Sequence, residues 1–192
     1  MSISSISEVH KTPDSIYAID IDDTILYYEH LPETWWTELT EKISSYPANA
    51  NALATDNSQI LSIWESIIKI SVPTAINPKE FMQLVEYCKT HNSHLVLLTA
   101  RYTRLDSITR EHLKILFPDY HPEIIFCSNE NKGLKLRQAY GYIDMSIDVN
   151  KYNHLYFIDD KQYNIDNVLQ VLPYTLCYKF DYMEYIYNFE NL

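Results

Sequence analysis

Residues 15–26, SIYAIDIDDTIL, decide the fold of this chain. The apolar run at 16–19 predicts a short buried strand, and three carboxylates follow it at once. Because side chains alternate across a strand, Asp20 and Asp22 point to one side and Asp23 to the other. Two carboxylates that converge at the end of a buried strand repel each other, and a hard cation with oxygen ligands relieves the repulsion. The stretch therefore predicts a Mg²⁺ site, against the alternative of a solvated strand end with an acidic turn.

The composition indicates a globular protein that does not bind polyanions. Of 192 residues, 46% are apolar, which is enough for one packed core, and the formal net charge is −11. An acidic surface is a poor match for nucleic acid or an anionic membrane, since phosphate groups attract Lys and Arg. The chain has two glycines, so it has no glycine-rich phosphate loop. We expect neither nucleic acid nor a membrane as partner.

Cysteine usage and the first residues predict the compartment. The three cysteines are widely spaced and form no CxxC motif, which is typical of reduced thiols. Residues 1–14 are polar, lack the apolar core of a signal peptide and are expected to be a flexible leader. No apolar run approaches the roughly 20 residues that span a bilayer. We expect a cytoplasmic protein, with signal-independent secretion left open.

Strands and helices are expected to alternate along most of the chain. The apolar runs at 94–101, 123–127, 154–160 and 174–180 predict strands, and the amphipathic segments between them predict helices. Such alternation predicts right-handed crossovers and a doubly wound, mainly parallel α/β sheet flanked by helices. The polar residues at the carboxyl ends of the strands then converge at one edge of the sheet.

Residues 29–75 interrupt this alternation. They contain an amphipathic run with Trp35 and Trp36, and then a strongly apolar helical run that ends before a proline. We expect a small helical insertion after the first strand, with the core formed by 15–28 and 76–192. Core packing explains the two tryptophans best, and lining a pocket is the alternative.

The strand ends and one helix start together carry a set of polar side chains. These are Asp20, Asp22, Thr24, Thr99, Lys132, Asp159 and Asp160. Carboxylates, a hydroxyl and a lysine at one edge suit a single task, which is to hold Mg²⁺ and a phosphoryl group. The lysine adds positive charge, and the hydroxyl donates a hydrogen bond to a phosphate oxygen.

In this order, the motifs resemble those of the haloacid-dehalogenase-like (HAD-like) superfamily of phosphatases. AIDIDDT resembles the first motif, LVLLT the second, Lys132 in NKGLKL the third and LYFIDD the fourth. The resemblance covers residues 14–27 and 77–172. It implies a Rossmannoid core, Mg²⁺ as cofactor and a small helical cap formed by the insertion. TAR after the second motif, NKG, FIDDK with its following Asn, and the tryptophan pair resemble a little-characterised bacterial branch of unknown function.

The resemblance also implies roles for the acidic residues. Asp20 is the nucleophile that forms an aspartyl-phosphate, and Asp22 is the general acid and then the general base. Asp20, the backbone carbonyl of Asp22 and a carboxylate of the fourth motif hold Mg²⁺. Either Asp159 or Asp160 is the direct ligand, and the other supports it.

The remaining implied roles concern phosphate and substrate. Thr99 binds a phosphoryl oxygen, and Lys132 bridges the phosphate and the nucleophile, with Lys135 as the competitor for that role. Arg101 follows Thr99 closely and either reaches the substrate or pairs with an acidic residue of the next helix, Asp106 or Glu111.

The sequence therefore predicts a Mg²⁺-dependent phosphomonoesterase that works through an aspartyl-phosphate on a small phosphorylated substrate. A phosphoprotein phosphatase is one alternative, and a HAD-fold binding or regulatory module without turnover is another. The intact pair of Asp20 and Asp22 counts against the second, because a binding module has no need of an acid–base carboxylate. The motifs specify neither the substrate nor the oligomeric state.

Overall fold

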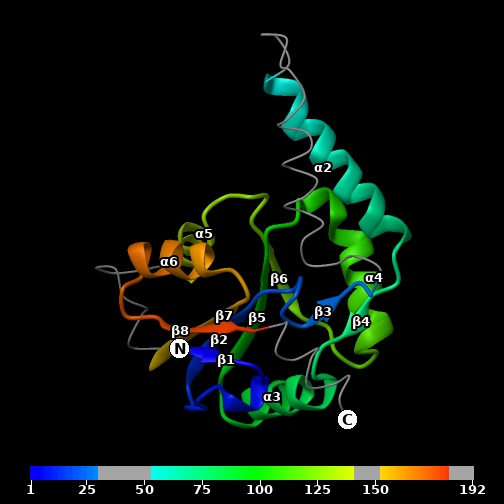
Figure 1. The fold of residues 1–192 in the computed structure, drawn as a ribbon. Coiled ribbons are helices and arrows are strands. Elements are labelled where there is room, and N and C mark those ends of the chain that lie inside the picture. The colour runs from blue at the N-terminus through cyan, green and yellow to red at the C-terminus, as the bar shows by residue number, and fades with distance from the viewer. Residues whose placement is uncertain (30–52, 141–151, 182–192) are drawn as a thin grey trace.

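The computed structural model describes residues 1–29, 53–140 and 152–181, and Figure 1 shows their arrangement. The strands are β1 (Ser2–Ile3), β2 (Ser15–Ile19), β3 (Leu26–Tyr27), β4 (Thr74–Ala75), β5 (His94–Thr99), β6 (Glu123–Phe126), β7 (His154–Asp159) and β8 (Leu176–Phe180). The helices are α2 (Leu53–Ile70), α3 (Pro78–Thr90), α4 (Asp106–Leu116), α5 (Lys132–Tyr140) and α6 (Gln162–Val171), with the 3₁₀ turns η1 (Ile6–Glu8) and η2 (Thr103–Leu105).

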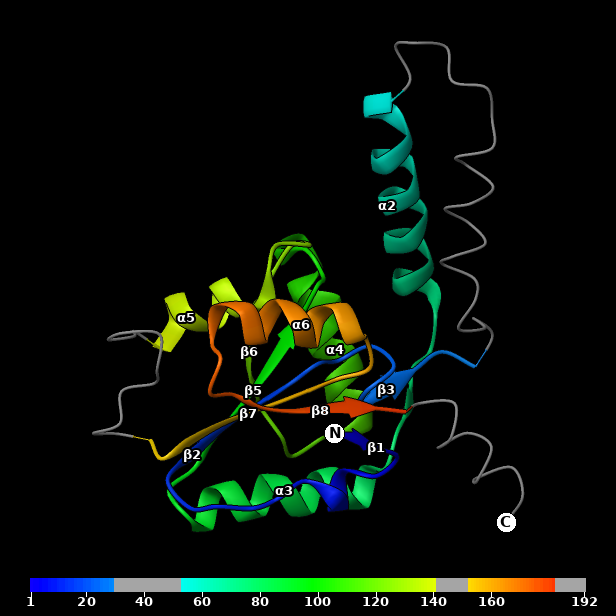
Figure 2. The same ribbon diagram turned by 60° about the vertical axis from the view of Figure 1, so that its left-hand side comes forward.

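Six strands form one sheet in the order β1-β8-β7-β2-β5-β6, and every neighbouring pair is parallel. Alternate residues of β2 enter different cores. Tyr17 and Ile19 pack with residues of α3 and α4, whereas Ile16 and Ala18 pack with residues of α5 and α6. Figure 2 shows α3 on one side of the sheet and α5 and α6 on the other. The expected parallel, helix-flanked α/β sheet is confirmed.

The first residues of the chain belong to this sheet. Strand β1 pairs in parallel with β8, and the N–H of Asp181 donates to the carbonyl of Ile3 at 2.7 Å. The side chains of Ile3, Ile6 and Val9 are buried. Burial of three apolar side chains within nine residues corrects the expectation of a flexible segment, since their transfer from water stabilises the ordered state.

Strand β2 lies at the point where the strand order reverses. Its neighbours are β5 on one side and β7 on the other, and the chain visits β5 and β6 before it crosses to β7 and β8. In open parallel sheets, ligands bind outside the carboxyl ends of the strands at such a switch point. The residues that follow β2, β5 and β7 therefore meet there.

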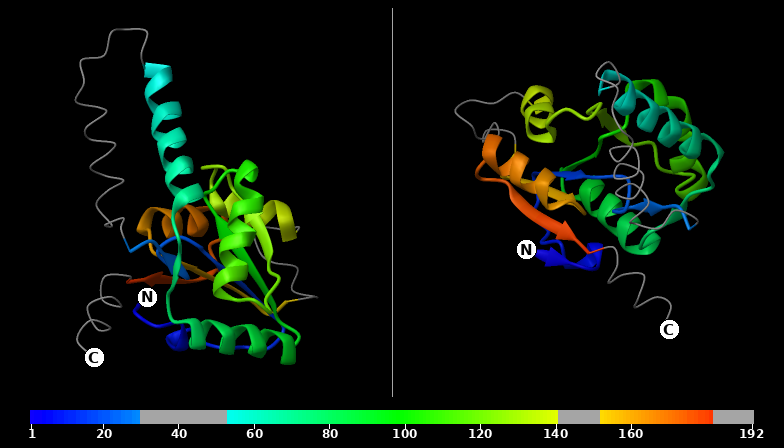
Figure 3. Two further views of the ribbon diagram at one scale, coloured as in Figure 1. Left: turned by 90° about the vertical axis from the view of Figure 1, so that its right-hand side faces the viewer. Right: turned by 45° about the horizontal axis from the view of Figure 1, so that its top comes forward.

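A short antiparallel pair, which we call the stem, closes the base of the insertion. Leu26 pairs with Ala75 and Tyr27 with Thr74. Helix α2 begins at Leu53 and extends away from the sheet (Figure 3). Within the described segments no helix is both long and apolar enough to cross a bilayer. Trp35 and Trp36 lie outside the described residues.

Candidate active site

Asp20 lies at the end of β2, and its carboxylate is almost completely buried. Backbone hydrogen bonds between the parallel strands hold Asp20 in this place. Its N–H donates to the carbonyl of Ile158 on β7 at 2.9 Å, and its Oδ1 lies 2.7 Å from the Nζ of Lys132. Burial raises the pKa of Asp20 well above its usual range, the Lys132 charge opposes this shift, and nearby carboxylates add to it. The positive charge of Lys132 therefore offsets part of the effect by which burial disfavours the ionised form, the form that a nucleophile needs.

Lys132 joins two carboxylates from the start of α5. Its Nζ lies 2.7 Å from Asp20 Oδ1 and 2.7 Å from Asp159 Oδ2, and its side chain is 2% exposed. Burial by itself would lower the pKa of this lysine, but the two carboxylates outweigh burial and raise it. The next residue, Gly133, lets α5 approach α6 closely, because a Cβ there would lie 2.9 Å from the backbone oxygen of Asn167. The missing side chain thus helps to place Lys132.

The two acids that end β7 have different surroundings. Asp159 is fully buried, and its oxygens accept from the Lys132 ammonium, the Lys161 N–H at 2.9 Å and the Asn164 amide at 2.9 and 3.0 Å. Asp160 lines the pocket and pairs with the Lys161 ammonium at 2.6 Å. Burial raises the pKa of Asp160 to about 6, and Lys161 opposes the shift. Asp159 is therefore held by donors, while Asp160 faces the space where a ligand would bind.

Three carboxylates lie close enough to share a cation. One oxygen from each of Asp20, Asp159 and Asp160 lies within 4.8 Å of the other two. The donors are all carboxylate oxygens, which suit a hard divalent ion, and the raised pKa values of Asp20 and Asp160 show that positive charge is favourable there. The residues present thus fit a divalent metal ion.

Asp22 is held by a guanidinium. Arg101 Nη2 donates to Asp22 Oδ1 at 2.6 Å and Arg101 Nε donates to Asp22 Oδ2 at 3.0 Å. Arg101 is fully buried and is not among the residues that line the pocket. Asp106, one of its expected partners, instead accepts from Arg110 at 2.8 Å. The bond partners of the Arg101 guanidinium in the described chain are Asp22, Tyr28 and Thr109, and Glu111 is not among them.

Two threonines lie beside the carboxylates. Thr99, the last residue of β5, is fully buried, and its Oγ1 accepts from the Arg101 N–H at 3.1 Å. That bond uses a lone pair, so the hydroxyl proton stays available to another acceptor. Thr24 is also fully buried, and within the described residues its Oγ1 has no hydrogen-bond partner.

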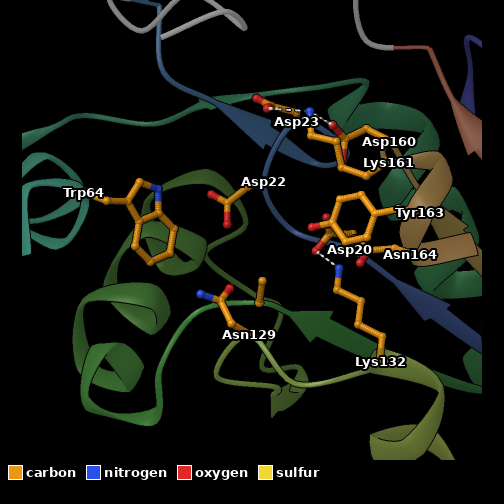
Figure 4. Close-up of a pocket in the computed structure, with 11 residues that line it drawn as sticks. Asp20, Asp22, Asp23, Trp64, Asn129, Lys132, Asp160, Lys161, Tyr163 and Asn164 are labelled. Carbon is orange, nitrogen blue, oxygen red and sulfur yellow. Dashed lines mark ion pairs between the residues drawn. The ribbon is translucent and has the colours of Figure 1, made fainter. Parts of the chain in front are cut away.

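A pocket of about 210 Å³ opens above Asp20 (Figure 4). It is lined by Asp20, Asp22, Asp23, Trp64, Ala100, Asn129, Lys132, Asp160, Lys161, Tyr163 and Asn164. In this view, Trp64 of α2 and Tyr163 of α6 lie on opposite sides of Asp22. Lys135, the competitor of Lys132, instead pairs with Glu130 at 2.9 Å and is not a lining residue.

The structure therefore brings most of the sequence-derived candidates to one place. Asp20, Asp22, Lys132 and Asp160 line the pocket, and Asp159 lies beneath it against Lys132. Sequence reasoning missed the lining residues Trp64, Ala100, Asn129, Lys161, Tyr163 and Asn164. The expectation that Asp23 points away from Asp20 and Asp22 is wrong, because Asp23 lines the same pocket. Asn164 could have been found from the sequence, since it follows FIDDK in the fourth motif. Trp64 could not, because it belongs to an amphipathic helical pattern that core packing explains equally well.

Comparisons with known proteins give only remote likenesses. No protein-family model matches the chain, and no curated protein is significantly similar to it. A HAD hydrolase of family IA, variant 3, from Entamoeba histolytica is 14% identical, with a TM-score of 0.49 over 82% of this chain and 80% of that chain. A HAD-superfamily hydrolase from Ehrlichia chaffeensis is 13% identical, with a TM-score of 0.45 over 95% and 98% of the two chains.

Proposed function

We propose that this chain is a HAD-like phosphomonoester hydrolase that requires Mg²⁺ and works through an aspartyl-phosphate. One observation carries the proposal: the buried carboxylate of Asp20 lies 2.7 Å from the Lys132 ammonium, and one of its oxygens lies within 4.8 Å of oxygens of Asp159 and Asp160, close enough to share a cation. A nucleophile, a compensating charge and a cation site thus meet at the floor of one pocket.

In the first step, a carboxylate oxygen of Asp20 attacks phosphorus and the bond to the leaving oxygen breaks. Lys132 balances the charge of the phosphoryl oxygens and of Asp20, and the Thr99 hydroxyl donates to a phosphoryl oxygen. Asp22, which lines the same pocket, gives a proton to the leaving oxygen.

In the second step, the same residues release phosphate. Asp22, now ionised, removes a proton from a water molecule, and the water oxygen attacks phosphorus. The bond between phosphorus and Asp20 breaks, which regenerates the free carboxylate. The exposure of the Asp22 side chain, 31%, leaves it open to both the leaving group and the water.

The metal ion would be held by Asp20, by Asp160 and by the backbone carbonyl of Asp22. We assign the direct contact to Asp160, because the oxygens of Asp159 already accept from Lys132, Lys161 and Asn164. When bound, Mg²⁺ supplies positive charge that offsets the carboxylates and polarises the phosphoryl group. Asp159 then keeps Lys132 in place.

The size and charge of the site favour a small phosphorylated substrate. A volume of about 210 Å³ lies below the range of typical drug-sized pockets. The net charge of −11 disfavours binding of nucleic acid. The free cysteines support a reducing, cytoplasmic location. A phosphorylated side chain of a protein is the second candidate, because exposed Tyr163 and half-buried Trp64 at the pocket offer aromatic contacts to a peptide.

A panel of phosphomonoesters that includes phosphopeptides tests the proposal. Phosphate release is measured with Mg²⁺, with EDTA, and with Asp20→Asn, and exposed Asp119→Asn is the control for loss of a carboxylate. We expect release that needs Mg²⁺, is lost in Asp20→Asn and is unchanged in Asp119→Asn. Absence of release from every substrate with the wild type would favour a binding module instead.

A further inference from the structure

Arg101 carries a charge that is completely removed from water. Its side chain is 0% exposed, although it follows a strand end beside an open pocket. Its Nε and Nη2 donate to the two oxygens of Asp22 at 3.0 and 2.6 Å. Two parallel bonds between a planar guanidinium and a carboxylate fix the orientation of the carboxylate as well as its position.

The rest of the guanidinium is held by two other parts of the chain. Nη1 donates to Thr109 Oγ1 on α4 at 3.0 Å, and Nη2 donates to the Tyr28 hydroxyl at 2.8 Å. The Tyr28 hydroxyl in turn lies 3.1 Å from Nδ1 of His112, also on α4. Because Tyr28 directly follows stem strand β3, Asp22 is connected through Arg101 both to a core helix and to the base of the insertion.

We propose that Arg101 is a positioning residue that aims Asp22 at the water which releases phosphate, and that Tyr28 and Thr109 hold Arg101 for this task. The inference rests on the function proposed above. Asp22 lines the pocket and Arg101 does not, so the guanidinium acts on the reaction only through Asp22. A structural role alone would not require an ion: a buried apolar side chain often stabilises a fold as well as a buried ion pair does.

p-Nitrophenyl phosphate separates the step that needs Asp22 from the step that does not. In the first step, an Asp20 oxygen bonds to phosphorus, and the P–O bond breaks with its electron pair on p-nitrophenolate. This anion is stable and needs no proton. In the second step, water bonds to phosphorus, its proton passes to Asp22, and the bond from phosphorus to Asp20 breaks to release inorganic phosphate. A misplaced Asp22 therefore slows only the second step.

The experiment is rapid mixing of p-nitrophenyl phosphate and Mg²⁺ with wild type, Arg101→Met, Arg101→Lys and a control, Arg110→Lys. The control alters a half-exposed arginine ion pair on α4. For Arg101→Met we expect a burst of about one equivalent of p-nitrophenolate, followed by steady turnover at least about tenfold slower than in the wild type. This loss is smaller than the full rate acceleration that a general base supplies, because Asp22 is still present. KM should fall together with kcat, because the phosphoenzyme accumulates. Arg101→Lys should lie between wild type and Arg101→Met, and Arg110→Lys should match wild type.

Three outcomes would overturn the inference. The first is an Arg101→Met enzyme that turns over at the wild-type rate. The second is an Arg101→Met enzyme that loses burst and turnover in equal proportion and has a lower melting temperature, which means that Arg101 only supports the fold. Where Arg101→Met does not fold, Tyr28→Phe carries the test and should show the same burst with a smaller rate loss; a Tyr28→Phe enzyme without a burst overturns it. A wild type that releases nothing refutes the proposed function itself, so the two failures are distinguished within one series.

Discussion

Removal of the Lys132 ammonium should destabilise the protein more than removal of any surface charge. In Lys132→Met, Asp20 and Asp159 stay buried and lose the cation that lies 2.7 Å from each. Breaking a buried ion pair by deleting one partner costs about 3–5 kcal/mol, because the remaining charge is uncompensated. In a domain of this size, each kcal/mol lowers Tm by about 2–4 °C, so the expected fall is roughly 6–20 °C.

The assay is urea and thermal unfolding in EDTA, so that no divalent ion replaces the ammonium. Lys135→Met is the matched control, since Lys135 lies on the same helix and pairs with the exposed Glu130. Surface pairs contribute at most about 1 kcal/mol, and the control should lose no more than that. The loss in Lys132→Met should shrink as the pH falls, because the pKa of Asp20 is already raised by burial and protonation removes the unpaired charge. A loss below about 1 kcal/mol would refute the account of Lys132 as a buried bridge.

Three further changes test other parts of the structure. Burial and the Arg101 charge lower the pKa of His112 to about 4, so His112 gains a proton in the unfolded state first as the pH falls. The free energy of unfolding should therefore drop between pH 6.5 and pH 4, by about 2 kcal/mol at pH 5. In His112→Gln, the plot of unfolding free energy against pH should lack this drop. Gly133→Ala should cost about 1–3 kcal/mol, because the added Cβ meets the Asn167 carbonyl oxygen at 2.9 Å, and an unchanged urea midpoint would contradict this. Trp64→Ala should raise KM for aryl phosphates more than for alkyl phosphates, since only the former can stack on the indole, and equal effects in steady-state assays would argue against contact with the ring.

The central sheet could be predicted from the sequence because its strands are continuous apolar runs. The central strands β2, β5 and β7 lie between helices and are almost entirely buried, so runs such as HLVLLT carry a clear signal. Strand β1 was missed because it has two residues in a serine-rich stretch, and Ile3 and Ile6 are too few to form a pattern. The stem strands were missed for the same reason: each has two residues.

Within the site, local motifs located the residues but not their partners. Arg101 and Asp22 are 79 positions apart, and only the fold brings β5 beside β2 and makes that ion pair. Likewise, the sequence places Asp159 and Asp160 side by side, whereas their difference arises from the donors around Asp159. Partners that meet through tertiary contacts leave no periodic signal in the chain.

The stem has a consequence for how this protein can evolve. Because Leu26 pairs with Ala75 and Tyr27 with Thr74, the chain leaves the core and returns to it at a single point. The entropy cost of closing a loop grows only slowly with its length, so the segment between the paired ends can lengthen or shorten at little entropic cost. Tyr28, which holds Arg101, and Ile68, which is buried in the core, have to be kept in such a change. Residues 15–26 are untouched by such a change. Apart from Tyr28, selection on which molecules enter the pocket and selection on the chemistry can therefore act on separate parts of the chain.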